Sequence, residues 1–245
     1  MGEIKELAAL IKESKSMVFF GGAGVSTDSG IPDFRSKTGS FTSVDTEYAP
    51  EEILSYSFFT EHTKEFFEYW RKNMIYENAI PNKAHNALAF LEKTGKLKMI
   101  ITQNIDGLHQ RAGSMNVIEL HGSIYSNYCV CCHKNFPLSF VTSTSGIPIC
   151  HCGGVIRPDV VLYEESLDVK HLEDAQRTIE KADLLLVSGT SLLVYPAAAL
   201  IKNLKSGRLV IINLSRTIYD TKADLVIHER VADVLSQVIT FVEET

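Results

Sequence analysis

The sequence predicts an α/β protein in which a parallel sheet carries helices on both faces and a smaller second domain is attached. Short apolar runs bounded by turn residues alternate with segments of helical period, and this order of elements builds a covered parallel sheet. Two longer stretches interrupt the alternation. With 245 residues, of which 45% are hydrophobic, the chain is long enough to bury a large core.

The apolar runs are the candidate strands, and the segments between them are the candidate helices. The runs are short and continuous, as expected of strands that are buried on both faces. We expect strands at 17–20, 99–102, 117–120, 184–188, 209–213 and 225–227. We expect helices at 3–13, 83–93, 169–181, 196–204 and 231–243.

The two interrupting stretches are expected to pack together as the smaller domain. Residues 37–80 are rich in Phe, Tyr and Glu at helical spacing, and residues 125–156 hold all five cysteines. A cleft between two domains is a common place for substrates to bind. The sequence therefore predicts a binding site between the sheet and this smaller domain.

The charge and hydropathy of the chain limit its partners. A formal net charge of −6 argues against a nucleic-acid binder held by phosphate contacts and mildly suits basic partners such as lysine-rich peptides. No apolar run approaches the ~20 residues that span a bilayer. The first twenty residues lack the apolar core and cleavage site of a signal peptide. We therefore expect a cytoplasmic protein that binds neither a membrane nor nucleic acid.

The cysteines predict a structural zinc site. Cys129 and Cys132 form a C-x-x-C pair, and Cys150 and Cys152 form a C-x-C pair farther along the chain. Two such pairs fit a tetrahedral site of four thiolates, which leaves no open position for water. Cys131 is then the surplus thiol, and the alternative ligands are His133 and His151. The competing interpretation is a thioredoxin-like redox pair, but that motif needs no distant second pair.

The stretch after the first expected strand predicts a phosphate-binding turn. Gly22, Ala23 and Gly24 precede the hydroxyl residues Ser26 and Thr27. A strand, a glycine turn and a helix start are typical of a dinucleotide site, because backbone N–H groups and the helix dipole favour a pyrophosphate. The spacing is not G-x-G-x-x-G, and the acidic residue expected roughly 20 positions on is missing, which disfavours a hydride-transfer dehydrogenase. An ordinary tight turn is the alternative.

Two further stretches place polar side chains directly after expected strands. Gln103, Asn104 and Asp106 follow one strand, and His121 follows the next. The carboxyl ends of parallel strands are where α/β sheets bind ligands. A histidine there, beside a glycine, is a candidate general base, with an ordinary hydrogen-bonded histidine as the alternative. His109 lies on the segment after Asp106 and is expected to be structural.

Taken together, these motifs resemble the sirtuins, the NAD-dependent protein-lysine deacylases, of bacterial or archaeal type. The resemblance runs over nearly the whole chain and rests on "GAGVSTDSGIPDFR", "QNIDGLHQRAG", "ELHGS", the four paired cysteines, "GTSLLVYPAA" and "IIN". It implies a Rossmann-like NAD-binding domain from 1–36, 81–123 and 157–245. It also implies a small domain made of a helical module, 37–80, and a zinc module, 124–156.

The resemblance also implies which residues bind NAD, which is consumed rather than reduced. Ala23 and Thr27 would hold the pyrophosphate, and Phe34 and Arg35 would cover the reactive ribose and exclude water. The implied contacts to the rest of NAD are Gln103 and Asn104 at the nicotinamide ribose, Ile105 and Asp106 at the carboxamide, Thr190 and Ser191 at phosphate and adenosine, Asn213 at the adenosine ribose and Val231 at the adenine.

The implied reaction transfers an acetyl group from lysine to the ribose. The acetyl-lysine carbonyl oxygen attacks C1′ as nicotinamide leaves, and the product of this step is an O-alkylamidate. His121 then removes a proton through the ribose hydroxyls, and Asn104 assists as the second catalytic residue. The products are free lysine, nicotinamide and O-acetyl-ADP-ribose. The rival functions are ADP-ribosyl transfer to protein and a zinc-scaffolded module that senses NAD without turnover.

Two positions depart from the family pattern, one ahead of the glycine turn and one in the expected substrate segment. Gly21 stands where Thr is more common, and Glu164 replaces the Gly that usually precedes Glu165. The segment around Val161 and Tyr163, and residues 192–194, would pair with the substrate backbone.

The acyl group is expected to enter an apolar pocket. Phe67 and Trp70 occupy the positions at which succinyl-preferring sirtuins carry Tyr and Arg, and Arg71 is the nearest cation in the sequence. We therefore expect acetyl-lysine, followed by propionyl- or butyryl-lysine, to be preferred over succinyl-lysine.

Overall fold

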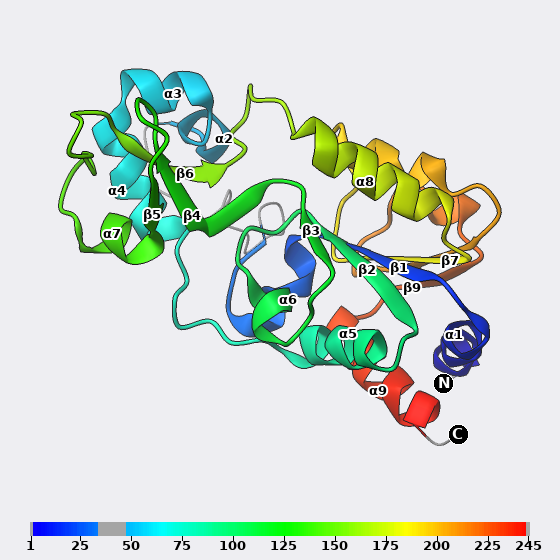
Figure 1. The fold of residues 1–245 in the computed structure, drawn as a ribbon. Coiled ribbons are helices and arrows are strands. Elements are labelled where there is room, and N and C mark those ends of the chain that lie inside the picture. Colours follow the sequence, from blue (N-terminus) through cyan, green and yellow to red (C-terminus); the bar gives the residue numbers. More distant parts are fainter. Residues whose placement is uncertain (1, 34–47, 244–245) are drawn as a thin grey trace.

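The computed structural model describes residues 2–33 and 48–243. In this part of the chain, six parallel strands form one sheet in the order β3-β2-β1-β7-β8-β9 (Figure 1). The strands are β1 (Met17–Gly21), β2 (Leu97–Thr102), β3 (Val117–Glu119), β7 (Leu184–Ser188), β8 (Arg208–Ile212) and β9 (Leu225–Ile227). The predicted parallel sheet is confirmed, with each strand within two residues of its expected bounds.

Helices cover both faces of this sheet, because successive side chains of each strand point to opposite faces. Met17 and Phe19 of β1 pack under one set of helices, whereas Val18 and Phe20 pack under the other. The first set is α1 (Gly2–Glu13), α5 (Lys83–Lys93) and α9 (Val231–Glu243). The second is α8 (Val169–Glu180) with the 3-10 helix η3 (Ala197–Asn203).

The segment expected as an α-helix at 196–204 is instead a 3-10 helix. Residues three apart lie directly above one another in a 3-10 helix. This places the buried Ala197 above Leu200 and the buried Ala198 above Ile201, so that both pairs face the sheet. Packing against the sheet therefore overrides the good α-helix propensity of these residues.

The two interrupting stretches pack around one shared core, as expected. Phe66 and Trp70 of α4 belong to the same buried cluster as Cys129 and Ile156. The helices of this part are α2 (Pro50–Ile53), α3 (Tyr56–Glu61), α4 (Thr63–Asn73) and α7 (Leu138–Ser143).

The same part contains an antiparallel sheet that the sequence analysis did not predict. It has the order β5-β4-β6, from β4 (Gly122–Cys129), β5 (Asn135–Pro137) and β6 (Ile156–Val160). The expected domain boundaries at 123/124 and 156/157 fall within β4 and β6, and the division into domains stays a prediction. Among the described residues, no helix has the length and apolarity needed to cross a membrane.

Candidate active site and metal centre

The turn after β1 packs directly against the turn after β7. Gly24 N–H donates to the carbonyl of Gly189 at 2.8 Å. A Cβ on Gly22 would lie 2.9 Å from the Gly189 carbonyl oxygen, and one on Gly24 would lie 2.7 Å from the Gly189 Cα. Gly189 itself has a φ of 61°, which favours glycine. The glycines are therefore needed for backbone-to-backbone contact at this edge of the sheet.

The expected helix start after this turn is wrong. Two 3-10 turns follow instead, η1 (Ala23–Val25) and η2 (Thr27–Ser29), and Gly30 ends the second with a φ of 82°. The close contact with Gly189 and the left-handed residue at Gly30 prevent a regular helix. An anion at this turn would therefore be held by individual backbone groups rather than by the dipole of a long helix.

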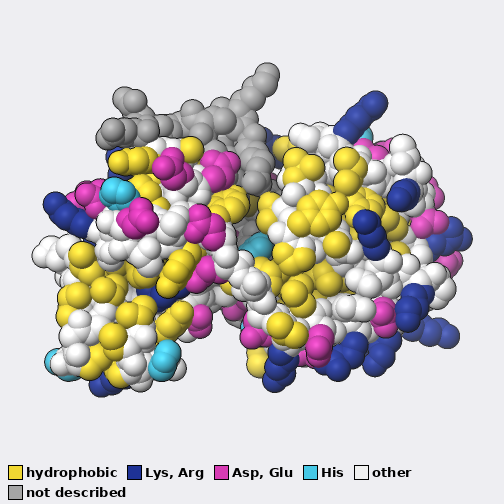
Figure 2. Space-filling view, turned by 90° about the horizontal axis from the view of Figure 1, so that it is seen from above, with side chains coloured by type: hydrophobic (Ala, Val, Ile, Leu, Met, Phe, Trp, Pro, Cys, Tyr) yellow, Lys and Arg dark blue, Asp and Glu magenta, His cyan; other side chains and the backbone are white. Residues whose placement is uncertain are grey.

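A cavity of about 680 Å³ lies along the carboxyl ends of the parallel strands. Figure 2 shows a hollow between the two parts of the molecule. The cavity brings together most of the residues expected from the sequence: Ala23, Thr27, Trp70, Gln103, Asn104, Ile105, Asp106, His121, Val161, Tyr163, Thr190, Ser191, Asn213 and Val231. Phe34 and Arg35 lie outside the described residues.

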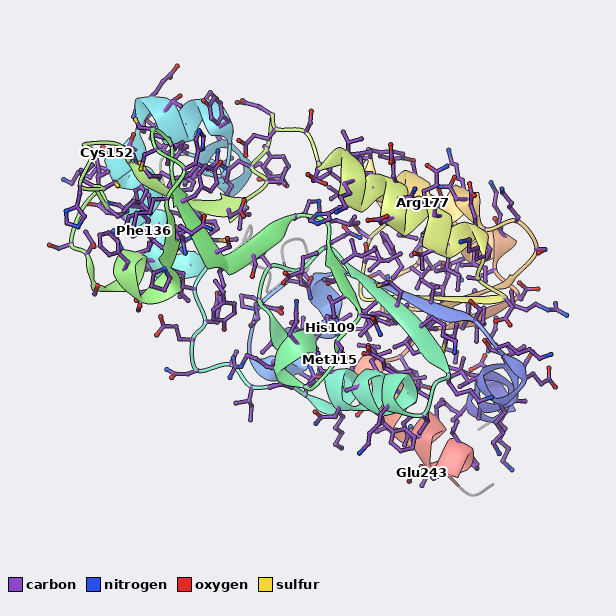
Figure 3. The ribbon with its side chains drawn as sticks, in the orientation of Figure 1. His109, Met115, Phe136, Cys152, Arg177 and Glu243 are labelled. Carbon is purple, nitrogen blue, oxygen red and sulfur yellow. The ribbon has the colours of Figure 1, made fainter. Side chains whose placement is uncertain are left out.

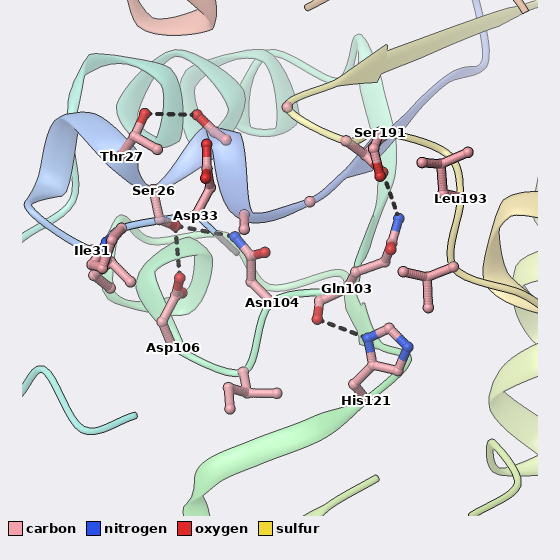
Figure 4. A pocket seen from close by; sticks show the side chains of 18 of the residues that line it. Ser26, Thr27, Ile31, Asp33, Gln103, Asn104, Asp106, His121, Ser191 and Leu193 are labelled. Atoms are coloured by element: carbon pink, nitrogen blue, oxygen red, sulfur yellow. Dashed lines mark hydrogen bonds between the residues drawn. The ribbon is translucent and has the colours of Figure 1, made fainter. Parts of the chain in front are cut away.

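His121 is held in one tautomer by the backbone of β2's carboxyl end. Its Nδ1 lies 2.9 Å from the carbonyl oxygen of Gln103 (Figure 4). A carbonyl oxygen only accepts, so Nδ1 carries the proton and Nε2 keeps its lone pair. Burial lowers the pKa of His121, and the hydrogen bond to Gln103 only partly offsets this effect. The imidazole is therefore neutral near pH 7, with Nε2 able to accept a proton.

The glycine after His121 allows the chain to cross β6 closely. Gly122 has a φ of 76°, and a Cβ there would lie only 2.0 Å from the carbonyl oxygen of Asp159. Next to this crossing, Val161 N–H donates to the carbonyl of His121 at 3.0 Å. The backbone of the expected base is thus joined directly to the segment expected to bind the substrate.

Three polar side chains from two loops, one after β1 and one after β2, meet at the cavity (Figure 4). Ser26 Oγ donates to Asp106 Oδ2 at 2.6 Å and accepts from Asn104 Nδ2 at 3.1 Å. Ser26 is fully buried, so its hydroxyl fixes the orientations of the Asn104 and Asp106 side chains. In this arrangement the Ser26 hydroxyl hydrogen is directed to Asp106 and not toward the cavity. Thr27 Oγ1 donates to the carbonyl of Gly24 at 3.1 Å.

Two buried histidines lie behind this group, and the sequence analysis missed the first. His85 Nδ1 accepts from Asn82 N–H at 3.3 Å, so Nε2 carries the proton and faces Ser26 Oγ at 3.5 Å. Burial lowers the pKa of His85 to about 4, although Asp106 opposes this shift. The position of His85 could have been predicted from "PNKAH", because Asn82 and His85 form a capping box at the start of α5.

His109 is the second histidine, and it is buried as expected of a structural residue. Its ring lies 4.8 Å from the ring of His85, and the residue is a buried member of α6 (Leu108–Arg111), labelled in Figure 3. Burial, with a further contribution from His85, lowers the pKa of His109 to about 3. Both histidines are therefore neutral at pH 7, and neither adds positive charge behind Asp106.

The acyl-pocket residues are only partly brought together. Trp70 lines the cavity, but Phe67 is buried in the core of the small part and is not among the described residues that line it. Arg71 is turned away from the cavity. Its guanidinium donates to the carbonyls of Val141, at 3.0 Å, and Gly146. Arg71 therefore offers no charge to an acyl group.

The four paired cysteines form a candidate metal centre in the small part. Their sulfur atoms all lie within 4.8 Å of one another, with 3.4 Å between Cys129 and Cys152 and 3.7 Å between Cys132 and Cys150. A tetrahedron with zinc–sulfur bonds of ~2.3 Å has sulfur–sulfur edges of about 3.8 Å, so this cluster fits zinc. Among the described residues, Cys131, His133 and His151 do not join the group.

The environment of these cysteines favours a structural metal. Backbone N–H groups of Cys132 and Cys131 lower the pKa of the Cys129 thiol to about 6, although burial opposes this shift. All five cysteines are free thiols, and Figure 3 shows Cys152 at the end of the small part that is distant from the six-stranded sheet. Four thiolates would fill a tetrahedral shell, so zinc here would support the fold rather than the chemistry.

Comparisons with known proteins agree with this architecture. The model of the Sir2 family matches residues 22–196. NAD-dependent protein deacetylases from Clostridium acetobutylicum and Clostridium tetani are each 54% identical to this chain; the first alignment covers 98% of this chain and 99% of the relative, and the second covers 96% of both. A solved Sir2–p53 peptide–NAD⁺ complex matches with a TM-score of 0.86 at 37% identity, covering 99% of both chains.

A second solved structure, a Sir2 complex with an inhibitor, 2′-O-acetyl-ADP-ribose and deacetylated p53 peptide, has a TM-score of 0.85 at 39% identity. This match covers 96% of the present chain and 97% of the other. The family match, the level of identity and the shared fold lead to one conclusion: the chain is a member of the Sir2 family, the sirtuins.

Proposed function

We propose that this protein is an NAD-dependent protein-lysine deacetylase, which converts an acetyl-lysine peptide and NAD to free lysine, nicotinamide and O-acetyl-ADP-ribose. Relatives at 54% identity carry this activity in their names, and related Sir2 structures hold NAD, a p53 peptide or an acetylated ADP-ribose. NAD is the co-substrate and is consumed in the reaction.

The observation that carries the proposal is the state of His121. The imidazole is neutral, and its Nδ1–H donates a hydrogen bond to the Gln103 carbonyl. Its Nε2 is therefore available as a base in the same cavity as Asn104 and Asp106. General-base catalysis requires this protonation state near the working pH. In the proposed reaction, His121 accepts a proton through the ribose hydroxyls after nicotinamide has left, so that the 2′-oxygen can attack the acyl carbon.

The Ser26 network supports the proposed roles of its two partners. Ser26 holds both side chains in fixed orientations. We assign Asp106, with Ile105, to the nicotinamide carboxamide and Asn104, with Gln103, to the nicotinamide ribose. A preset geometry of this kind lowers the barrier by removing reorganisation during the reaction.

The remaining NAD contacts follow the cavity from the glycine turn to β8. Backbone groups exposed by the glycines suit a pyrophosphate, and polar side chains beyond β7 and β8 suit the adenosine. We assign Ala23 and Thr27 to the pyrophosphate, Phe34 and Arg35 to the cover of the reactive ribose, Thr190 and Ser191 to phosphate and adenosine, Asn213 to the adenosine ribose and Val231 to the adenine.

The peptide side of the cavity is assigned to the segment after β6 and to α4. Val161 and Tyr163 would contact the substrate peptide, Tyr163 through its side chain because its backbone N–H and carbonyl bond Leu54 and Tyr56. Trp70 would contact the acyl group. Phe67 would shape the pocket only from behind Trp70, since it lies in the core. An apolar site without the Arg71 charge favours acetyl-lysine over succinyl-lysine.

We also propose a cytoplasmic location, which four clustered thiols suit because the cytosol keeps cysteines reduced. The zinc that these thiols would hold is assigned a structural role only.

One assay tests the proposed function. The protein is incubated with NAD and an acetyl-lysine peptide, and the products are quantified by mass spectrometry. Deacetylation requires one O-acetyl-ADP-ribose for each lysine freed. Transfer of ADP-ribose to protein, or NAD binding without any product, would instead support the rival functions.

A further inference from the structure

Glu164 adopts a backbone conformation that is unfavourable for its residue type. Its φ is 75°, in the left-handed region that favours glycine. The residue is exposed, so burial of its side chain does not explain this conformation. Interactions of the side chain must therefore compensate for the unfavourable backbone conformation. The side chain makes them with helix α3.

The carboxylate of Glu164 binds one residue of α3 through both oxygens. Oε2 accepts from Ser57 N–H at 2.9 Å, and Oε1 accepts from Ser57 Oγ at 2.9 Å. Ser57 is separated from Glu164 by more than a hundred positions in the chain, so this contact joins two distant segments. Each carboxylate oxygen therefore accepts one hydrogen bond from Ser57, and this pair of bonds orients the Glu164 side chain toward α3.

Backbone hydrogen bonds continue the same connection. Tyr163 N–H donates to the carbonyl of Leu54 at 2.9 Å, and Tyr56 N–H donates to the carbonyl of Tyr163 at 3.0 Å. Residues Ser55 and Tyr163 thereby form a parallel bridge. The substrate segment, defined here as residues 161–165, is thus attached to the turn between α2 and α3.

The next residue anchors the segment on its other side. Glu165 accepts from Arg157 of β6 through both oxygens, at 2.6 and 2.8 Å, and also from Leu162 N–H at 2.8 Å. Two successive glutamates therefore hold the segment between α3 and β6. All five residues of the segment line the cavity that His121 also lines.

We propose that Glu164 is a positioning residue for the peptide substrate, which holds the substrate segment against α3 through Ser57 and thereby presets the edge that pairs with the peptide. This inference rests on the proposed function. In this proposal Glu164 does not contact charged groups of the substrate, although it lines the part of the cavity assigned to the peptide.

The test compares two substrates that differ in how much peptide backbone they can pair with the substrate segment. One is an acetylated peptide with several residues on each side of the acetyl-lysine, and the other is a capped acetyl-lysine amide. Each is assayed at saturating NAD with wild type, Glu164→Gly, Glu164→Gln, Ser57→Ala and the double variant. Glu173→Gln, at an exposed position on α8 outside the cavity lining, is the control.

We expect Glu164→Gly to raise KM for the long peptide about 3- to 10-fold, the range for an exposed charge-assisted pair, with kcat within about 2-fold. Glycine tolerates the φ of 75°, so thermal stability should change little and cannot account for the effect. Ser57→Ala should show part of the rise, Glu164→Gln should retain part of the affinity, and the double variant should not exceed Glu164→Gly. KM for the capped amide should stay at the wild-type value.

Three results would overturn the proposal: an unchanged KM for the long peptide, equal changes for both substrates, or a change seen only with peptides rich in Lys or Arg. The last would mean that Glu164 contacts substrate charge directly. Binding of a fluorescent acetylated peptide, measured without turnover, separates this proposal from the proposed function. Wild type that binds peptide without product would refute only the function, and Glu164→Gly that binds as tightly as wild type would refute only the positioning role.

Discussion

Replacing His121 by alanine should abolish most of the deacetylation and leave the earlier step intact. Loss of a general base typically lowers a rate by about 10²- to 10⁴-fold, which corresponds to about 2.7–5.4 kcal/mol at 1.36 kcal/mol per factor of ten. The structure favours the upper part of this range. His121 is held by the Gln103 carbonyl at 2.9 Å, and loss of this preset imidazole leaves no equivalent base among the described neighbours Gln103, Asn104 and Ile105.

The pH dependence follows from the same geometry. His121 acts only when neutral, and burial lowers its pKa below the ordinary value of 6.5, with the Gln103 hydrogen bond opposing part of the shift. The acidic limb of kcat/KM should therefore lie below pH 6.5, with full activity above it. In His121→Ala, the residual rate should lose this limb.

The assay is a single-turnover experiment with an acetyl-lysine peptide and NAD. Nicotinamide release and O-acetyl-ADP-ribose formation are followed separately, because the base is needed only after nicotinamide has left. We expect nicotinamide release to persist and the acetylated product to fall. A variant that forms this product within about 10-fold of wild type, or a wild-type acidic limb above pH 6.5, would show that His121 is not the base.

Three further predictions concern the metal, the fold and the acyl group. Cys132→Ser should release zinc and destabilise the small part, whereas Cys131→Ser should keep its metal; elemental analysis that finds no zinc in protein purified without chelators would refute the centre. Glu165→Ala should lower the free energy of unfolding by about 3 kcal/mol in denaturant titrations, because Arg157, with 5% of its side chain exposed, is left without its counter-charge. Burial raises the pKa of Glu165, but hydrogen bonds from Arg157 and a backbone N–H outweigh it and lower the pKa overall. The stability contributed by the ion pair is therefore present above the unfolded-state pKa of about 4.3 and is lost as the pH falls through the folded-state pKa of Glu165. If the variant were less stable than wild type by the same amount in acid, the ion pair would be contradicted. On one peptide, kcat/KM for acetyl should exceed that for succinyl by about 10²-fold or more, since the succinyl carboxylate loses water beside Trp70 and gains no cation; equal values would show that the pocket is wrongly assigned.

Much of this protein was determined locally by its sequence. The strands of the parallel sheet are continuous apolar runs, and a run buried on both faces is visible without knowledge of its neighbours. Polar residues directly after such runs, including Asn104, Asp106 and His121, must meet at one edge, because parallel strands all end there. The C-x-x-C and C-x-C pairs likewise indicate their own chemistry through spacing alone.

The tertiary structure decided what depends on contacts between distant segments. Ser26 is a hydroxyl in a glycine-rich turn by sequence, and only folding places it between Asn104 and Asp106, with His85 behind it. The antiparallel strands β4 and β6 went unpredicted because they are not continuous apolar runs. β4 interleaves polar residues such as Asn127 with its apolar ones, and β6 contains Arg157, whose charge is tolerated there only through Glu165.

The same distinction applies to Glu164 and Arg71. The sequence has a glutamate at a position where the family resemblance implies glycine, and it has a cation next to Trp70. Both side chains could have faced the substrate. Folding instead directs Glu164 to Ser57 and Arg71 to the carbonyls of Val141 and Gly146. Where a long side chain points is set by which partners lie within its reach, and those partners come from segments that only the folded chain brings together.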